Sequence, residues 1–159
     1  MTPMVRRDIA TPLGPLTLIA DDSALLGAYF ADHRRRPDLD RWDAPAAHGV
    51  LDRAERGFGA YFSGAASDVP VGAVAPGTPF QREVWRALLA IPAGETWTYA
   101  QVAGAIGRPS AVRAVAAAIG RNPLTIAVPC HRVIGADGAL TGYAGGIERK
   151  RWLLAHEGI

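Results

Sequence analysis

The feature that most constrains the fold is a pair of short helical patterns separated by a tight break. Apolar residues recur at helical spacing over residues 98–106, glycine and proline interrupt the pattern at 107–109, and a second helical pattern then runs to Gly120. We expect Ser110 to cap this second helix, because its hydroxyl can accept a hydrogen bond from the first turn. Two short helices joined by a glycine-containing turn are typical of a helix-turn-helix.

The second of these helices is expected to have an outer face made of small residues. Its core stripe is expected at Val112, Val115, Ala116 and Ile119. The outer face is expected to carry Ser110, Ala114, Ala117 and Ala118, with Arg113 at its edge. Small side chains would let another backbone approach closely, and the arginine could then reach a phosphate or a groove. Alanine is also the best helix former, so a plain core helix remains the alternative.

The other patterns place strands before these helices and further helices around them. We expect strands at 9–11, 15–20 and 24–30, a charged loop at 32–43, and helices at 48–62, 80–91 and 147–156. The helix at 80–91 has Thr78 as its cap. Residues 126–128 have a strand-like composition, and the turn at 135–138, between Val133–Ile134 and residues 139–143, indicates a hairpin or a wing.

Proline and glycine interrupt a weakly apolar stretch around residues 69–78, which indicates a connector. We therefore expect an N-terminal α/β lid domain at 1–70, a linker at 71–77 and a second domain at 78–159. The fold class that follows is α+β: a small strand-rich N-terminal domain, followed by a mainly helical, winged helix-turn-helix-like domain suited to DNA binding.

Charge is distributed unevenly along the chain. The 159 residues carry a net charge of +2, but residues 1–77 hold eight arginines and ten acids, while residues 78–159 hold nine basic residues and five acids. The second part is therefore the one suited to a polyanion, although small asymmetries of this kind are common. No apolar run approaches the ~20 residues that span a bilayer, and no signal peptide is recognisable, so we expect a cytoplasmic protein.

Cys130 is the single cysteine of the chain, which excludes an internal disulfide and a cysteine-based zinc site. A lone cysteine is often just a small buried apolar residue. Here Pro129 precedes it and His131 and Arg132 follow, and a nearby imidazole and cation both favour the reactive thiolate. The pattern therefore indicates a nucleophile, with a structural cysteine as the alternative.

Four other residues could join such a site, although each has an ordinary explanation. Glu157 ends the last expected helix, at the unfavourable end of the helix dipole, where it could orient a histidine or simply be a surface acid. Asn122 before Pro123 is typical of a local turn. Tyr99 and Tyr143 are typical of half-buried packing residues.

The segment Pro129–Ile134 resembles the signature of the O6-alkylguanine-DNA alkyltransferases. The resemblance continues in the order and spacing of that family. Its further segments are Gly77–Gln81 with Val84–Trp85, Ile91–Thr96 with Tyr99, Arg113–Val115, Asn122–Pro123, Gly142–Gly146 and Leu153–Glu157. The match is dense over residues 77–158 and loose over the first 70, which resemble a short strand-rich lid domain.

The resemblance implies a role for each candidate residue. Cys130 would accept an alkyl group from O6 of guanine or O4 of thymine. His131 would draw off the thiol proton through a water, and Glu157 would orient and charge-balance His131. Tyr99 would donate a proton to the leaving guanine, and Asn122 would join the recognition helix to the active-site turn. The product would be a thioether with no ready route of hydrolysis, so each molecule would act once, without a metal or a cofactor.

The resemblance also implies how DNA is bound. The second helix would enter the minor groove through Ser110, Ala114 and Ala117, and Arg113 would fill the gap left by a flipped-out nucleotide. Flipping is needed because the alkylated oxygen is buried in the base stack. Other substrate contacts are expected at Arg132, Val133, Tyr143 and Ala144, with Val133 and the 143–144 loop gripping the base largely through backbone groups. The partner would be double-stranded DNA containing alkylated bases, bound by a monomer or in cooperative assembly along the DNA.

The sequence departs from the family pattern at Ala144, where many members have serine, so a hydroxyl contact to the base is lost. The first domain has no cysteine, which argues against the structural zinc of some relatives. Three rival functions stay open: a damage binder of the alkyltransferase-like group, a cysteine hydrolase and a transcription factor. Cys130 argues against the first and third, and the helix pair argues against the second.

Overall fold

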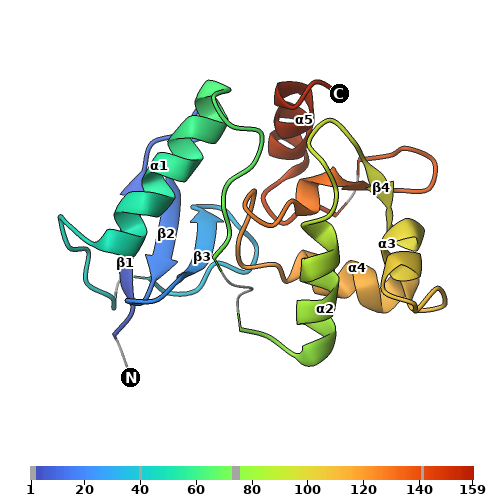
Figure 1. The fold of residues 1–159 in the computed structure, drawn as a ribbon, viewed down its shortest axis with the longest axis horizontal. Coiled ribbons are helices and arrows are strands. Elements are labelled where there is room, and N and C mark those ends of the chain that lie inside the picture. The colour runs from blue at the N-terminus through green and yellow to red at the C-terminus, as the bar shows by residue number, and fades with distance from the viewer. Residues whose placement is uncertain (1–2, 40, 73–75, 141) are drawn as a thin grey trace. The chain divides into compact units, whose positions relative to one another are not determined.

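The fold is that of a computed structural model, which describes residues 3–39, 41–72, 76–140 and 142–159. The α+β class predicted from the sequence is confirmed, because an antiparallel sheet forms early in the chain and helices dominate the later part (Figure 1).

The chain divides into two compact units. Unit 1 comprises Met1–Ala75 and Pro123–Ala127, and unit 2 comprises Pro76–Asn122 and Val128–Ile159. The segment 123–127 therefore groups with unit 1, although it falls inside the second domain that we predicted. Residues 73–75 of the predicted linker lie outside the described residues.

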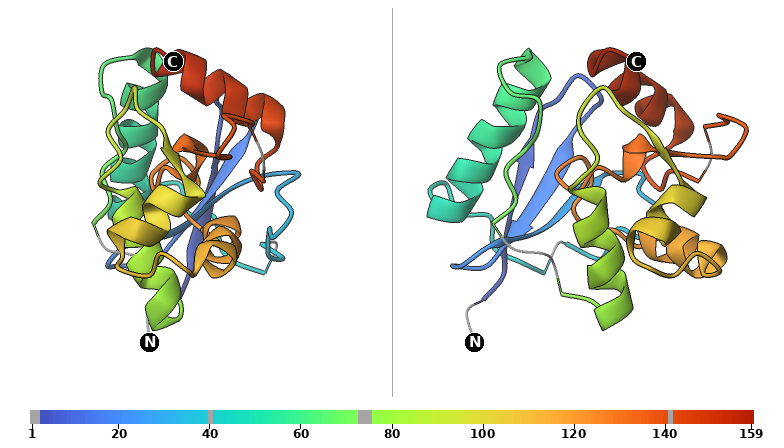
Figure 2. Two further views of the ribbon diagram at one scale, coloured as in Figure 1. Left: turned by 90° about the vertical axis from the view of Figure 1, so that its right-hand side faces the viewer. Right: turned by 45° about the vertical axis from the view of Figure 1, so that its right-hand side comes forward.

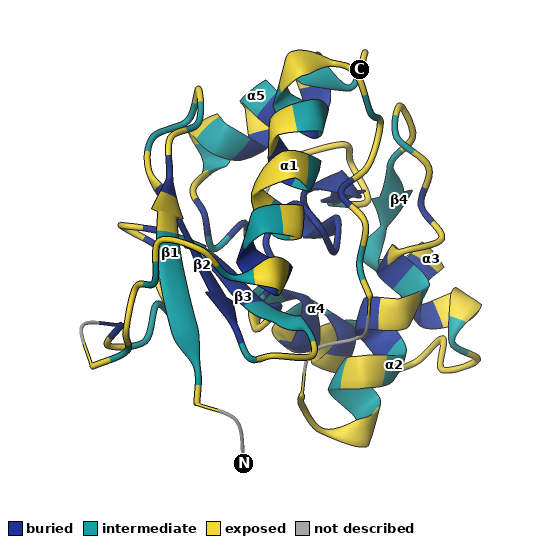
Figure 3. Cartoon of the chain, turned by 60° about the vertical axis from the view of Figure 1, so that its left-hand side comes forward, coloured by how far each residue is buried: buried dark blue, intermediate teal, exposed yellow. Residues whose placement is uncertain are grey.

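Unit 1 contains an antiparallel sheet with one helix packed on it. The strands β1 (Val5–Ile9), β2 (Leu16–Ala20) and β3 (Leu25–Phe30) lie in the order β1-β2-β3, and α1 (Gly49–Ser63) packs against them (Figure 1). Every residue of the central strand β2 is buried (Figure 3). The two later strands and the helix confirm the predictions.

The first strand and the loop of unit 1 differ in detail from the predictions. The strand expected at 9–11 ends at Ile9 instead, because Thr11 starts a turn in which its hydroxyl accepts a hydrogen bond from the N–H of Leu13 at 3.1 Å. The charged loop expected at 32–43 has no helix or ladder strand over its described residues, and residue 40 lies outside them.

The segment Pro123–Ala127 joins the sheet of unit 1 but does not continue as a strand. The N–H of Ala28 donates to the carbonyl of Pro123 at 2.8 Å, and Ala28 forms a parallel bridge with Leu124. The strand expected at 126–128 is wrong, because the chain turns at Ile126, whose φ is 71°. A β-branched residue adopts this left-handed conformation only under strain, so no local pattern predicts it.

Unit 2 is mainly helical. Its elements are α2 (Pro79–Leu88), β4 (Trp97–Thr98), α3 (Tyr99–Ala105), α4 (Val112–Gly120), the short 3₁₀ turn η1 (Cys130–Arg132), β5 (Val133–Ile134) and α5 (Ile147–His156). The helices α2, α3 and α4 pack on one another (Figure 2). The helix-turn-helix expected from the sequence is therefore the pair α3 and α4.

The starts of α2 and α3 follow from local sequence chemistry. Thr78 and Thr98 each accept a hydrogen bond from the backbone N–H three residues later, and the side chains of Gln81 and Gln101 accept the N–H of the respective threonine in return. These capping boxes satisfy N–H groups that the first turn leaves without partners. The predicted cap at Thr78 is confirmed.

The start of α4 differs from the prediction. Its N-cap is Ala111, without a side-chain cap, and Ser110 lies exposed ahead of the helix. The reason is a preceding turn, in which the N–H of Ala111 donates to the carbonyl of Arg108 at 2.9 Å. Ala118, expected on the outer face, is buried instead, which leaves Arg113, Ala114 and Ala117 as the exposed residues of that face.

The hairpin or wing expected after Val133 is present as a turn closed by the N–H of Gly135, which donates to the carbonyl of Ala139 at 2.9 Å, without paired strands among the described residues. The turn is present, because the N–H of Gly138 donates to the carbonyl of Gly135 at 2.9 Å, but no strand follows it, and residue 141 lies outside the described part. Strand β5 instead pairs in parallel with β4, with Trp97 opposite Val133. This pairing ties the start of α3 to the turn that carries Cys130.

Candidate active site

The residues expected to carry the chemistry all belong to unit 2. Cys130 and His131 form the start of η1, Asn122 follows α4, Tyr99 is the first residue of α3 and Glu157 is the C-cap of α5. The candidate residues therefore come from four separate segments of unit 2, whose elements are labelled in Figure 1.

A tight turn around Pro129 positions Cys130. Pro129 has φ −80° and ψ 63°, and the N–H of Cys130 donates to the carbonyl of Val128 at 2.8 Å. These values are those of an inverse γ-turn, for which the ring of proline sets φ in advance. Asn122 Nδ2 donates to the same carbonyl of Val128 at 2.8 Å. Two hydrogen bonds to the carbonyl of Val128 thus hold the turn in place. Cys130 itself is 8% exposed.

His131 is paired with the carboxylate at the end of α5. Its Nε2 lies 2.7 Å from Glu157 Oε2, and the two side chains are 0% and 2% exposed. Because an ionised carboxylate can only accept, Nε2 carries the proton and Nδ1 keeps its lone pair. Nδ1 is buried and makes no hydrogen bond with a described residue. A histidine oriented in this way by an acid can act as a general base.

Arg132 was expected among the DNA and substrate contacts, and this expectation is wrong. The side chain is buried, with 1% exposure. Its Nε and Nη2 donate to the two oxygens of Glu157 at 2.7 and 3.0 Å, and its Nη1 donates to the carbonyl of Ile91 at 2.7 Å. The guanidinium turns inward because the buried carboxylate of Glu157 offers it a bidentate partner, whereas the surface does not.

The electrostatics of Cys130 also differ from the sequence-based expectation. Burial raises the pKa of the Cys130 thiol, while a hydrogen bond from Asn122 and the charge of Lys150 act in the opposite direction. Burial lowers the pKa of His131, which Glu157 raises and the charges of Arg132 and Lys150 lower. The resting pair is therefore a thiol and a neutral imidazole, because desolvation outweighs the neighbours that favour the thiolate.

Lys150 is a component of the site that our sequence reasoning missed. It is almost completely buried on α5, and its Nζ donates to the carbonyl of Val133 at 2.5 Å. Burial lowers the pKa of Lys150 to about 8, and a negative charge on Cys130, present only in the thiolate form, would act in the opposite direction. The signal was present in the sequence, because Lys150 stands one helical turn from Ile147 and from Leu153 and Leu154, on the apolar face of the helix.

The glycine-rich loop at 142–146 lies against Tyr99. A Cβ at Gly142 would stand 3.2 Å from the hydroxyl of Tyr99, which is half-buried, and a Cβ at Gly145 would stand 2.7 Å from the ring of Tyr143. Tyr143 is buried and Ala144 is half-buried. The side chain of Val133 is also buried.

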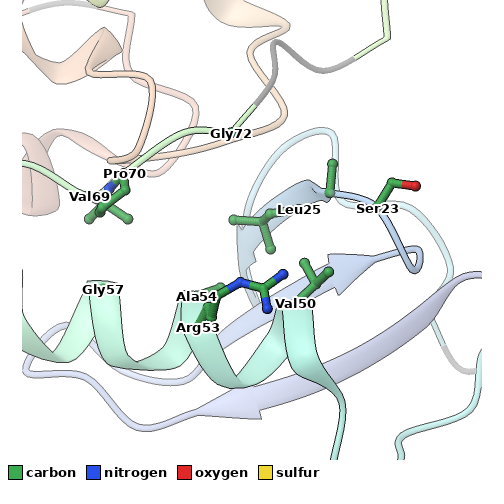
Figure 4. Close-up of a pocket in the computed structure, with 10 residues that line it drawn as sticks. Ser23, Leu25, Val50, Arg53, Ala54, Gly57, Val69, Pro70 and Gly72 are labelled. Carbon is green, nitrogen blue, oxygen red and sulfur yellow. The ribbon is translucent and has the colours of Figure 1, made fainter.

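A cavity of about 300 Å³ lies elsewhere, within unit 1 (Figure 4). It is lined by apolar side chains such as Leu25, Val50 and Val69, with Ser23 and Arg53 as polar groups. None of the candidate residues lines it. Among the described residues, no group of three or more His, Cys, Asp or Glu side chains could hold a metal ion. In the same described part, no helix is long and apolar enough to cross a membrane.

Comparisons with known proteins agree with this geometry. Residues 79–159 match the family described as 6-O-methylguanine DNA methyltransferase, DNA binding domain. The chain is 46% identical to the methylated-DNA–protein-cysteine methyltransferase of Salmonella typhimurium, over 99% of this chain and 98% of that protein.

Solved structures of Mycobacterium tuberculosis proteins share the fold. The O6-methylguanine methyltransferase is similar with a TM-score of 0.87 and 45% identity, over 97% of this chain and 92% of that one. The structure of OGT in complex with DNA gives a TM-score of 0.86 and 46% identity, over 96% and 91%. The chain therefore belongs to the methylated-DNA–protein-cysteine methyltransferase family.

Proposed function

We propose that this protein repairs alkylated DNA by transferring the alkyl group from O6 of guanine, and from O4 of thymine, to the sulfur of Cys130. The observation that carries the proposal is the buried series of Cys130, His131 and Glu157 within a DNA-binding domain. A buried thiol with a raised pKa needs a base at the moment of reaction, and His131 presents an unprotonated Nδ1 in the same turn.

The reaction is a displacement at carbon. His131 Nδ1 takes the thiol proton through a water molecule, and Glu157 stabilises the imidazolium that forms. The thiolate sulfur bonds to the alkyl carbon as the bond from that carbon to O6 breaks, and its electron pair passes to the guanine. The hydroxyl of Tyr99 gives a proton to the leaving base. The thioether product has no ready hydrolysis route, so each molecule reacts once.

The base must leave the duplex to reach the sulfur, because its alkylated oxygen lies within the stack. The helix α4 presents Ala114 and Ala117 on its exposed face, which allows a close approach to the minor groove. Arg113, exposed on the same helix, fills the gap left by the flipped nucleotide, and Ser110 contacts the backbone from the preceding turn. The backbone of Val133 and of the loop with Tyr143 and Ala144 grips the base.

The test is intact mass spectrometry after mixing the protein with duplex DNA that carries one O6-methylguanine. We expect a stoichiometric gain of one methyl group on Cys130, and no gain in Cys130→Ser. An unchanged mass with tight binding to the lesion would instead indicate a damage sensor. Absence of both binding and mass gain would overturn the assignment, and repeated turnover would indicate a hydrolase.

A further inference from the structure

Arg132 takes part in no step of the proposed reaction, although it is among the largest fully buried side chains of the chain. Its three nitrogens each have an acceptor: Nε and Nη2 donate to Glu157, and Nη1 donates to the carbonyl of Ile91. A buried guanidinium carries a large desolvation cost, which these three hydrogen bonds help to offset.

One oxygen of Glu157 is shared. Oε2 accepts from Arg132 Nη2 at 3.0 Å and lies 2.7 Å from His131 Nε2, while Oε1 accepts from Arg132 Nε at 2.7 Å. The arginine and the histidine therefore compete for the negative charge of one carboxylate. Because the guanidinium of Arg132 is always protonated, it is the positive partner of Glu157 at every physiological pH.

The consequences of removing Arg132 follow from elementary electrostatics. Without Arg132, the buried negative charge of Glu157 would face only His131, and the pair could neutralise it by taking up one proton in either of two ways. The carboxylate can draw a second proton onto the imidazole, which then has no lone pair, or it can itself become protonated and donate to Nε2. The second case moves the ring proton to Nδ1. In either case Nδ1 is protonated and His131 can no longer accept the thiol proton.

We propose that Arg132 is a positioning residue that keeps Glu157 ionised and offsets its negative charge, so that His131 stays neutral, with its proton on Nε2 and its lone pair on Nδ1. The inference rests on the proposed function, because it concerns the base of that reaction. It adds a fourth member to the series of Cys130, His131 and Glu157, and this member acts without touching the substrate.

The two cations near His131, Arg132 and Lys150, act on its pKa in the same direction. Burial is the largest influence on the pKa of His131 and lowers it, Glu157 raises it, and Arg132 and Lys150 lower it. Cys130, the adjacent titratable group, is a thiol at rest because burial raises its pKa. The cation of Arg132 thus opposes the protonation of His131 from a position where it also fixes the carboxylate.

The first test reads the ring of His131 directly, by nitrogen NMR of protein labelled with ¹⁵N-histidine and without DNA. The signal is assigned by its loss in His131→Gln. We expect an unprotonated Nδ1 in the wild type and in Arg132→Lys, which retains a cation. In Arg132→Met we expect a protonated Nδ1 near neutral pH. The matched control is Arg151→Met, an exposed arginine of α5 paired with Glu148, which should leave the signal unchanged.

The second test is the rate of methyl transfer to Cys130. We expect Arg132→Met to slow transfer about 100-fold, the usual contribution of a general base. Arg132→Lys should slow transfer about tenfold, because an ammonium cannot form the two-pronged contact with Glu157. In a Glu157→Gln background, Arg132→Met should slow methyl transfer by less than about a further threefold, because the effects of residues that act through one another are not additive.

The outcomes separate this inference from the proposed function. Wild-type ring signals in Arg132→Met, or losses that multiply in the double variant, would overturn the positioning role. If Arg132→Met does not fold, the comparison of Glu157→Gln with the double variant still decides, because a further loss of more than about threefold would contradict the positioning role. If the wild type transfers no methyl group, the proposed function fails, whereas the ring signals, read without DNA, still report on Arg132.

Discussion

The indole N–H of Trp85 donates a hydrogen bond of 2.8 Å to the carbonyl of Ala118, and both residues are buried. Trp85 belongs to α2 and Ala118 to the last turn of α4, where the same carbonyl also accepts the N–H of Arg121 at 3.1 Å. The bond therefore links the end of the helix proposed to bind DNA to α2.

We expect Trp85→Phe to lower the free energy of unfolding by about 1–3 kcal/mol, because the carbonyl loses a buried donor and the smaller ring leaves a gap. Denaturant-induced unfolding measures the change. Arg82→Ala, at an exposed position of the same helix, should change it by less than about 0.5 kcal/mol. Equal losses in both variants would contradict the role of the indole.

Gly142 is expected to control the position of the proposed proton donor. Its φ is 65°, and a Cβ there would stand 3.2 Å from the hydroxyl of Tyr99. We expect Gly142→Ala to slow methyl transfer about tenfold to a hundredfold, because it displaces a group that must be precisely oriented. Gly138→Ala is the matched control, since its φ is 82° and its Cβ would meet nothing within 4 Å. Both variants bear the left-handed strain, so an equal slowing would show that Tyr99 is not the cause.

Asn122 is expected to affect both stability and the cysteine. Asn122→Ala removes the donor to the carbonyl of Val128 and should cost about 1–3 kcal/mol of stability. It should also raise the pKa of Cys130 further, because the hydrogen bond from Asn122 lowers that pKa. Asn122→Asp should raise it still more, since a carboxylate disfavours a neighbouring thiolate.

The pH dependence of Cys130 alkylation by iodoacetamide measures this effect of Asn122. The neighbouring variant Arg121→Ala, at an exposed position, serves as the control and should leave the profile in place. A profile of Asn122→Asp that coincides with the wild type would rule out the contribution of the amide.

Lys150 predicts a pH dependence of stability with a definite sign. Its pKa in the folded protein, about 8, lies below the ordinary value of 10.5. Between these values the unfolded chain binds more protons, so the contribution of this group to the free energy of unfolding rises with pH across the window. Below it, the buried ammonium bears its full desolvation cost.

The comparison of wild type with Lys150→Met, unfolded in denaturant at several pH values from 7 to 10, isolates this effect. Near pH 7 the variant avoids the cost of the buried ammonium, and this advantage in the free energy of unfolding should shrink as pH rises. A pH-independent loss from the missing hydrogen bond to Val133 is added at every pH. Arg151→Met should show a pH-independent difference. A constant difference for Lys150→Met as well would mean that the lysine does not titrate in this range.

The accuracy of the sequence-based expectations depended on how local the determining interactions are. The cap at Thr78 and the helix with Leu153 and Leu154 inward were predictable, because their partners lie within one or two turns. The cap at Ser110 failed because a turn closed by the N–H of Ala111 takes up that residue before α4 begins. The strand at 126–128 failed because tertiary packing holds Ile126 at φ 71°.

The sequence alone determined the α+β class, the helix pair and the presence of a cysteine flanked by proline and histidine, because these depend on spacing and on neighbours in the chain. Only the folded chain decided which charges act on that cysteine. Arg132, two residues from Cys130, donates hydrogen bonds to Glu157, whereas the charge of Lys150, 20 residues from Cys130, lowers the pKa of the cysteine. The reason is burial: desolvation and the choice of ion-pair partner depend on which elements pack together, and neither can be read from adjacency.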